Sequence, residues 1–219
     1  MKKAYLYKRL LLDMVYPNRC PFCDDYIPFD EYYCTDCADR LSPPPEHDGF
    51  RDIDFFASVT EYDAYSKPLV NKMKKESDGY ALSVAAFMIF RSITEAKLLS
   101  DIDIVTYVPM RRRDKLRRGY NQTAVIAREL AQIADKPCAA LLKKVRDTSQ
   151  QKTLGAADRR KNVKDAFVCK RGNLSGKKVL IIDDVCTTGS TLSEAAAKLK
   201  SAGASMVIAA VFAKTGKIS

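Results

Sequence analysis

The hydrophobic positions along the chain alternate between short continuous runs and longer stretches with helical spacing. Four continuous apolar runs predict buried strands, at residues 55–61, 103–110, 179–182 and 206–212. Between them, apolar residues recur at helical spacing and predict helices at residues 62–76, 80–99, 121–133 and from 189 to about 202. This alternation predicts an α/β fold in which a parallel sheet is flanked by helices.

The first fifty residues show a different pattern. A short amphipathic helix is expected over residues 4–16, followed by two Cys-x-x-Cys hooks that are separated by ten residues. A hairpin is expected between the hooks, with Tyr26–Ile27 paired to Tyr32–Tyr33. The four cysteines of the hooks are Cys20, Cys23, Cys34 and Cys37.

Two such hooks can supply all four ligands of a tetrahedral zinc ion. Two disulfides, four unrelated thiols or iron–sulfur ligation are the alternative interpretations. No histidine lies within the module, and four cysteines leave no open ligand position, so the zinc is expected to be structural. A module this small cannot bury a core, so metal binding should contribute to its folding energy.

A proline-rich segment follows the cysteine module. The sequence Ser42–Pro45 and the polar residues after it predict a stiff, extended linker that holds the module at a distance. His47 is expected to be a solvated linker residue. The predicted domains are therefore residues 1–48, with the zinc module and linker, and residues 49–219, with the α/β sheet.

Length and composition agree with this division. A chain of 219 residues with 47% hydrophobic residues can form one α/β domain and a small module. No apolar run is long enough to span a bilayer, so membrane insertion is not expected. The basic and apolar start of the chain suggests a signal peptide, but Asp13 interrupts it, and a cytoplasmic protein is the preferred interpretation. Seven cysteines are an odd number, and four at metal spacing suit a reducing compartment.

Charge is distributed unevenly between the two parts. Residues 1–50 contain six Lys/Arg and nine Asp/Glu, a balance of −3, whereas residues 51–219 contain thirty-one and eighteen, a balance of +13. A basic surface on the larger domain favours phosphorylated or polyanionic partners. Solubility alone is the alternative explanation.

The strongest chemical signal lies where the apolar run 179–182 ends in Asp183 and Asp184. A loop rich in Thr, Ser and Gly follows and opens onto a helix, whose first N–H groups lack internal partners and favour an anion. A phosphate beside two carboxylates indicates a ligand that also carries sugar hydroxyls or magnesium. The Lys of a P-loop and the glycines of a dinucleotide fingerprint are absent. A polar surface turn is the alternative.

This stretch resembles the phosphoribosyl-pyrophosphate (PRPP) motif of type I phosphoribosyltransferases. The resemblance implies that Asp183 and Asp184 bind the ribose and that the following loop binds the 5-phosphate of PRPP, with magnesium. Cys186 is expected to contribute its backbone N–H, although a thiol near a helix N-terminus can have a lowered pKa. The phosphate-binding residues implied are Val185, Cys186, Thr187, Thr188, Gly189, Ser190 and Thr191.

A basic run follows the strand at 103–110, and six of the eight residues 111–118 are Lys or Arg. It is expected as a loop on the edge of the sheet that carries the phosphate site. A solvated charge run before a helix is the alternative. Residues Pro109, Met110, Arg111 and Arg112 are the expected pyrophosphate loop. Residues Arg112, Arg113, Lys115, Arg117 and Arg118 are the expected contacts to a nucleic-acid backbone.

Residues 145–167 are polar and lack periodicity, which is typical of a functional lid or of disorder. Gln151, Arg159 and Asn162 are the residues of this expected flexible hood that are predicted to close over the ligand.

Two longer patterns combine with these features. Val108–Pro109 is followed by Arg118–Gly119–Tyr120–Asn121–Gln122, and Gln151 by Leu154, Arg159 and Asn162–Val163. Together with the four-cysteine module and the PRPP motif, they resemble the ComF family over nearly the whole chain. Arg111 departs from the expected His or Ser.

The resemblance implies a cytoplasmic protein that binds PRPP-like ligands and handles single-stranded DNA during natural transformation, with a helicase-like competence protein as a partner. Two alternatives remain. One is an active phosphoribosyltransferase with an unidentified acceptor, in which Asp183 and Asp184 hold the ribose as positive charge develops. The other is a PRPP-sensing regulator or adaptor.

Overall fold

The structure is a computed structural model of the whole chain, and it describes residues 17–75, 79–146, 163–170 and 174–216. The helix expected over residues 4–16 lies outside the described residues. The same is true of the expected hood residues Gln151, Arg159 and Asn162.

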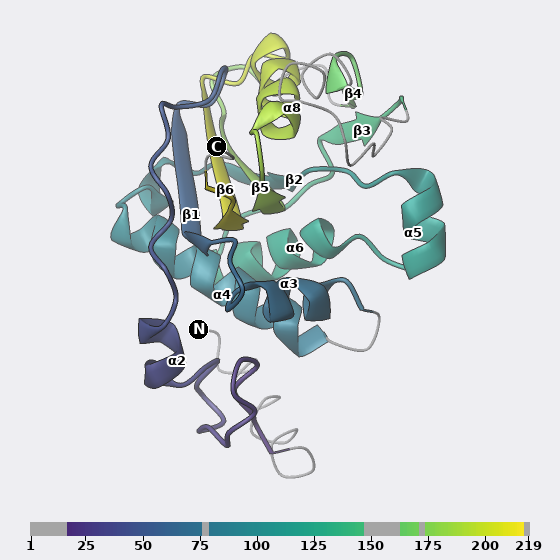
Figure 1. The fold of residues 1–219 in the computed structure, drawn as a ribbon. Helices are drawn as coiled ribbons and strands as arrows, with labels where there is room; N and C mark the ends of the chain where they lie inside the picture. The colour runs from purple at the N-terminus through teal and green to yellow at the C-terminus, as the bar shows by residue number, and fades with distance from the viewer. Residues whose placement is uncertain (1–16, 76–78, 147–162, 171–173, 217–219) are drawn as a thin grey trace.

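The described elements follow the predicted alternation (Figure 1). The amino-terminal module contains α2 (Thr35–Asp39). The larger part contains β1 (Phe55–Glu61), α3 (Lys67–Met73), α4 (Gly79–Glu95), η1 (Leu99–Asp101), β2 (Ile104–Tyr107), α5 (Arg112–Arg118), α6 (Gln122–Ala134), β3 (Leu142–Lys144), β4 (Phe167–Cys169), β5 (Lys178–Cys186), α8 (Ser190–Ser201) and β6 (Met206–Lys214).

The main sheet has the strand order β1-β6-β5-β2, and all three pairings are parallel. β5 is central and buried on both faces, because its side chains alternate between two cores. Leu180 and Ile182 belong to one core, while Val179 and Ile181 belong to the other. Since the strands are parallel, their carboxyl ends meet at one edge, which Figure 1 shows at the arrowheads of β5 and β6.

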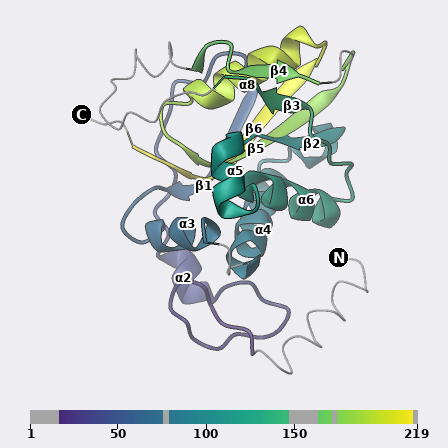
Figure 2. The ribbon, with the colours of Figure 1, turned by 90° about the vertical axis from the view of Figure 1, so that its right-hand side faces the viewer.

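Helices cover both faces of this sheet. Figure 2 shows α3, α4 and α6 on one side, and α8 with the small antiparallel β3–β4 sheet on the other. The predicted α/β class, a parallel sheet flanked by helices, is therefore confirmed.

Several predicted boundaries were wrong, and each has a local reason. β5 continues through Asp183 and Asp184 to Cys186, because β6 pairs with it along this whole length. The basic run expected as a loop forms helix α5, which Gly119 ends in the left-handed conformation at φ 78°.

The predicted hairpin in the cysteine module was also wrong. Tyr26 pairs with Arg19 rather than with the segment at Tyr32, through an isolated antiparallel bridge. The second hook instead begins helix α2, with Cys34 as its N-cap. The chain returns directly after the first hook because Asp24 adopts a positive φ of 67°.

The linker does not hold the module at a distance, so that expectation was wrong. Tyr32 is 2% exposed and stacks on Phe87 of α4, with ring centroids 4.2 Å apart. The Tyr80 hydroxyl donates to the Tyr32 carbonyl at 3.0 Å, and Arg91 donates to the Tyr33 hydroxyl at 2.9 Å. The module therefore shares a hydrophobic core with the larger domain.

We predict that Tyr32→Ala destabilises the whole protein by about 3–5 kcal/mol, because it leaves a cavity beside Phe87 in the shared core. Tyr26→Ala is the matched control, because Tyr26 is 66% exposed and stacks only under Arg19 among its described ring contacts; about 1 kcal/mol or less is expected. Urea unfolding followed by circular dichroism measures both values. Equal values for the two variants would contradict the shared core.

Candidate functional site

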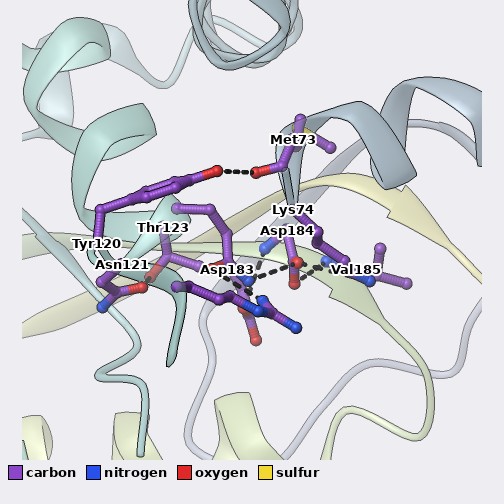
Figure 3. Close-up of polar contacts among 10 residues, drawn as sticks. Met73, Lys74, Tyr120, Asn121, Thr123, Asp183, Asp184 and Val185 are labelled. Atoms are coloured by element: carbon purple, nitrogen blue, oxygen red, sulfur yellow. Dashed lines mark hydrogen bonds and ion pairs between the residues drawn. The ribbon is translucent and has the colours of Figure 1, made fainter. Parts of the chain in front are cut away.

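The paired acids lie at the carboxyl end of β5, at the edge where all four strands of the main sheet end (Figure 3). Each carboxylate accepts a hydrogen bond from the backbone N–H of the next residue. Asp183 Oδ1 accepts from the Asp184 N–H at 2.9 Å, and Asp184 Oδ1 accepts from the Val185 N–H at 2.8 Å. These bonds orient each carboxylate relative to the backbone of the strand.

Asp184 is bound by two side chains from other elements. Gln122 Nε2, from the first position of α6, donates to Asp184 Oδ2 at 3.1 Å. Lys74 Nζ, just after α3, lies 3.9 Å from the same oxygen. Arg118 in turn donates to Gln122 Oε1 at 3.3 Å. The sequence pattern at Val108–Gln122 includes Arg118 and Gln122, but it predicts no role for Gln122. Nothing in the sequence indicated a role for Lys74.

The environment of Asp183 disfavours its ionised form. Burial, and then the charge of Asp184, raise its pKa well above the ordinary value, while the charge of Lys144 opposes this shift. Two adjacent carboxylates that cannot both ionise without cost are a site for a cation or for donor groups such as sugar hydroxyls. The influence of Lys144 was not predicted, because its charge acts on Asp183 from β3, beyond any local motif.

The loop after β5 has the geometry of an anion site. Gly189 is the N-cap of α8, with φ 72° and ψ −4°, and it offers no side chain to the first N–H groups of this twelve-residue helix. Thr188 Oγ1 accepts from the Ser190 N–H, at a long 3.5 Å. Thr188 Oγ1 and Ser190 Oγ lie 2.9 Å apart at the entrance to the helix, and Thr187 is exposed. Val185 and Thr191 are half-buried at the two ends of the loop.

Gly189 is also required sterically. A Cβ atom at this position would lie 2.1 Å from Cδ1 of Phe50, so the ring of Phe50 covers the loop. Phe50 stacks on His47, at 5.1 Å between ring centroids, and both rings contact Phe56. His47 was expected to be a solvated linker residue; it is exposed, yet it belongs to this aromatic cluster beside the phosphate loop.

The thiol of Cys186 behaves differently from a reactive cysteine at a helix end. Cys186 is 2% exposed, and burial, followed by the charge of Asp183, raises its pKa to about 12. The suggestion of a lowered pKa was therefore wrong. Because the strand continues through Cys186, its side chain points into the core instead of toward the helix.

Lys214 is a further cation at this edge that the sequence reasoning missed. It ends β6, pairs in register with Cys186 and is only 5% exposed. Its ammonium group donates a hydrogen bond to the carbonyl of Thr215 at 3.1 Å. Its positive charge adds to the effect of burial in lowering the pKa of His47. At Cys186 the same charge partly opposes the rise in pKa that burial and Asp183 cause. An ammonium group buried beside the phosphate loop suits an anionic ligand.

The strand β2 contributes the opposite wall. The carbonyl of Val108 accepts from Thr123 Oγ1 at 2.8 Å and from Asn121 Nδ2 at 3.4 Å, which ties the end of β2 to the start of α6. Pro109, Met110 and Arg111 follow at the predicted edge, but Arg112 is already part of helix α5 rather than of a loop.

Within α5, Arg113, Lys115 and Leu116 are exposed, Leu116 at 76%, while Arg118 is half-buried and turned toward Gln122. The predicted nucleic-acid residues are thus split by the structure. Arg118 belongs to the acid site, whereas Arg113 and Lys115 face the surface; the side chains of Arg112 and Arg117 lie outside what the structure describes.

The four cysteines Cys20, Cys23, Cys34 and Cys37 are brought together as predicted. Their sulfur atoms all lie within 4.8 Å of one another, and the Sγ atoms of Cys23 and Cys34 are 3.8 Å apart. Four sulfurs at ~2.3 Å from a tetrahedral zinc would be roughly 3.8 Å apart. The residues therefore fit a four-cysteine zinc centre, with all ligand positions taken.

Comparison with known proteins shows what the chain is similar to. The family model described as a phosphoribosyl transferase domain matches residues 118–217, and a double zinc ribbon domain matches residues 11–48. Competence protein F of Haemophilus influenzae is 27% identical over 189 residues, which cover 84% of this chain and 80% of that protein. The chain is a homologue of competence protein F. The predicted resemblance to the ComF family is thereby confirmed.

Other homologues carry a second name. DNA utilization protein YhgH of Escherichia coli K12 is 27% identical, and that of Salmonella typhimurium is 29% identical; each match covers 86% of this chain and 80% of the relative.

Among solved structures, a glutamine PRPP amidotransferase from B. subtilis matches with 25% identity and a TM-score of 0.35. That match covers 50% of this chain and 22% of the amidotransferase. A purine phosphoribosyltransferase from Pyrococcus horikoshii matches with 23% identity and a TM-score of 0.36, over 57% of this chain and 71% of that one. Within the described residues, no helix is both long and apolar enough to cross a membrane.

The raised pKa of Asp183 predicts that this ComF homologue is destabilised by its own site. A carboxyl group with a raised folded-state pKa contributes stability below its unfolded value, and this contribution is lost as the pH rises through the folded-state pKa. We expect Asp183→Asn to raise the melting temperature, with a gain over the wild type that widens from pH 5 to pH 8.

Asp184→Asn is the matched control for this prediction, because Lys74 and Gln122 already bind the Asp184 carboxylate. It should leave the melting temperature unchanged or lower it. Thermal unfolding of the three proteins across the pH range provides the measurement. A lower melting temperature for Asp183→Asn at pH 8 would show that the paired charge is not a burden on the fold.

Proposed function

We propose that this protein binds PRPP, or a related ribose 5-phosphate ligand, at the carboxyl edge of its sheet and acts in the uptake or processing of single-stranded DNA during natural transformation. The observation that carries the ligand is the pair Asp183–Asp184 near the end of β5, followed by a short loop that leads into the N-terminus of α8. The names of the relatives, competence protein F and DNA utilization protein YhgH, support the role in DNA handling.

Each group at the edge has a place in this proposal. The loop from Val185 to Thr191, with the hydroxyls of Thr188 and Ser190, holds the 5-phosphate, and Lys214 is the nearby cation. Asp183 and Asp184 hold the ribose hydroxyls. Magnesium, when bound with PRPP, neutralises the pyrophosphate charge, and Pro109, Met110, Arg111 and Arg112 line the pyrophosphate side. The hood residues Gln151, Arg159 and Asn162 close over the ligand.

The remaining parts of the proposal concern partners and location. The protein works in the cytoplasm, where the zinc stays bound to reduced cysteines. Its two units are residues 1–48 and 49–219, which share a packed interface. The acidic zinc module is the docking element for a helicase-like competence protein, while the basic larger unit meets DNA.

A ligand-binding prediction follows from the charges at the edge. The double variant Asp183→Asn/Asp184→Asn should reduce magnesium-dependent binding of PRPP at least ~100-fold, since it removes two charge-assisted hydrogen bonds at roughly 1.5–3 kcal/mol each. Lys214→Met should reduce it about tenfold or more for the same reason. Isothermal titration calorimetry measures both.

Asp103→Asn is the matched control for the ligand experiment. Asp103 accepts from the Lys178 N–H at the opposite end of the sheet, so its replacement should leave binding unchanged. Retention of wild-type affinity by the double variant would place the ligand elsewhere and remove the basis of the proposal.

An active phosphoribosyltransferase is the second candidate, because the matched phosphoribosyl transferase domain spans residues 118–217. In that reaction the bond between the anomeric carbon and pyrophosphate breaks as a base nitrogen attacks, and the acid pair stabilises the positive charge on the ribose. Incubation with PRPP, magnesium and a panel of bases distinguishes the candidates. Pyrophosphate released with one particular base indicates the transferase, whereas tight binding without release indicates a binding protein or PRPP-sensing adaptor.

The DNA prediction rests on α5. Replacing Arg112, Arg113 and Arg117 by Ala should weaken retention of single-stranded DNA and lower the dependence of log affinity on log salt by about 0.7 for each phosphate that is no longer neutralised. The control replaces three exposed basic residues elsewhere on the domain, namely Arg128, Lys170 and Lys177. Filter binding from 50 to 200 mM salt provides the measurement. Equally weakened retention in both triple variants would reduce the DNA interaction to net charge alone.

A further inference from the structure

One polar group of the larger domain lies beside the cysteine cluster without a described partner. Tyr65 belongs to the turn between β1 and α3, and its ring stacks on Phe22 of the first hook, 5.6 Å between centroids and 5° from parallel. It packs against the buried cluster of Cys20, Ile27 and Cys37. Its hydroxyl oxygen is fully buried, and no described residue satisfies it with a hydrogen bond.

The position of Tyr65 is held by the turn rather than by its own hydroxyl. Asp63 Oδ1 accepts from the backbone N–H groups of Tyr65 and Ser66, at 2.9 and 2.8 Å. Asp63 Oδ2 accepts from Ser42 Oγ in the linker at 2.7 Å. The linker and the turn therefore aim the phenol at the cysteine cluster by contacts that do not involve its O–H group.

A buried hydroxyl without a hydrogen bond destabilises the fold, so a partner is expected. The acceptors beside it are cysteine sulfurs, because Tyr65 packs against the cluster that contains Cys20 and Cys37. A thiol is a weak acceptor, whereas a metal-bound thiolate is a strong one, because it carries negative charge. The orphaned hydroxyl is thus explained when Cys37 is ligated.

We propose that Tyr65 is an outer-shell partner of the metal centre and donates its O–H to the Cys37 sulfur when zinc is bound. The larger domain then completes the metal site of the module. Outer-shell donors fix ligand orientation and tune the metal–ligand bond, and their loss typically lowers metal affinity 10- to 100-fold.

The contacts of α3 extend this coupling toward the acid pair. Lys72 Nζ donates to the carbonyl of Pro21, inside the first hook, at 2.7 Å. At the end of α3, the Tyr120 hydroxyl donates to the carbonyls of Met73 and Lys75, at 2.9 and 2.8 Å. Lys74, between these two residues, is the one that reaches Asp184. One short helix therefore touches the metal hook and positions a cation at the candidate ligand site.

We infer from this arrangement that an occupied metal site holds α3, and with it Lys74, in place. The consequence for ligand binding rests on the function proposed above, whereas the metal–Tyr65 contact and the ordering of α3 do not. A seven-residue helix is too short to be stable alone, so it depends on such anchors.

The first test is Tyr65→Phe in the full-length protein loaded with cobalt(II) in place of zinc. The variant keeps the ring stacked on Phe22 and loses only the hydroxyl. We expect metal affinity, measured by competition with a chelator, to fall 10- to 100-fold. The thiolate-to-cobalt charge-transfer band should also move to lower energy, because a sulfur relieved of a hydrogen bond is a better electron donor. A merely structural role for the ring would not move this band.

Tyr26→Phe is the control for this experiment, because Tyr26 lies in the same module but is 66% exposed. It should leave the affinity and the band unchanged. If Tyr65→Phe matches the wild type in both readouts, the outer-shell contact is overturned. Thermal unfolding of each loaded variant verifies that the comparison is made between folded proteins.

The second test is hydrogen exchange of the α3 amides in zinc-loaded and metal-free protein. Removal of zinc should increase exchange over residues 69–75, and Lys72→Met should do so with zinc still bound. Lys67→Met is the matched control, because Lys67 is exposed on the same helix. Unchanged exchange in α3 while the module itself loses protection would overturn the coupling.

Binding of PRPP with magnesium separates this inference from the proposed function. If zinc-loaded protein binds PRPP and metal-free protein binds it about fivefold or more weakly, the coupling reaches the ligand site. If zinc-loaded protein does not bind PRPP, the proposed function fails, and the exchange and cobalt measurements still decide the role of Tyr65. Equal PRPP affinity with and without zinc overturns the extension to Lys74.

Discussion

The repulsion between two neighbouring carboxylates at the end of a buried strand is the constraint on which this edge of the molecule depends. Burial and the neighbouring charge of Asp184 raise the pKa of Asp183. The Asp184 carboxylate accepts a hydrogen bond from Gln122 and lies within ion-pair distance of Lys74. Those two partners come from α6 and α3, so the start of α6 and the end of α3 must lie at the same place. A structure that served stability alone would have no reason to assemble this arrangement.

The helices that carry these partners are fastened to one another. Tyr120 precedes α6, and its hydroxyl binds two carbonyls at the end of α3, so Gln122 and Lys74 approach Asp184 from a common support. The amino-terminal module stabilises the same region, since Tyr32 shares the core of α4 and Lys72 binds Pro21. The metal module is thus part of the scaffold on which the acid site is built.

Much of the architecture could be predicted because it depends on local patterns. The apolar run before Asp183 predicts a strand buried on both faces, and two Cys-x-x-Cys hooks predict a closed four-sulfur site. The turn from β5 into α8 follows from Gly189, which is the N-cap of the helix in the left-handed conformation. Such features depend on residues that are close to one another in the sequence. Periodicity and motif spacing detect relations over these short distances along the chain.

What could not be predicted depends on distant contacts. Lys74 and Asp184 are far apart in the sequence, and nothing near either residue indicates the other. The proline-rich linker suggested separation because composition describes stiffness, not where the module docks. In α5, the Lys and Arg residues are themselves good helix formers, and charge alone had suggested a loop. At Cys186, burial in a strand outweighs the nearby helix end.

The placement of the basic residues also separates two kinds of anion. Arg118 reaches Gln122 and thereby the acid pair, whereas Arg113 and Lys115 on the same helix face outward. A helix presents residues three or four positions apart on one face, so Arg113 and Arg118, five positions apart, face different directions. Under the proposed function, a polyanion on the outside of α5 would therefore use Arg113 and Lys115, whereas Arg118 is engaged beside the acid pair. Arg112 is the residue that the proposal assigns to both anions.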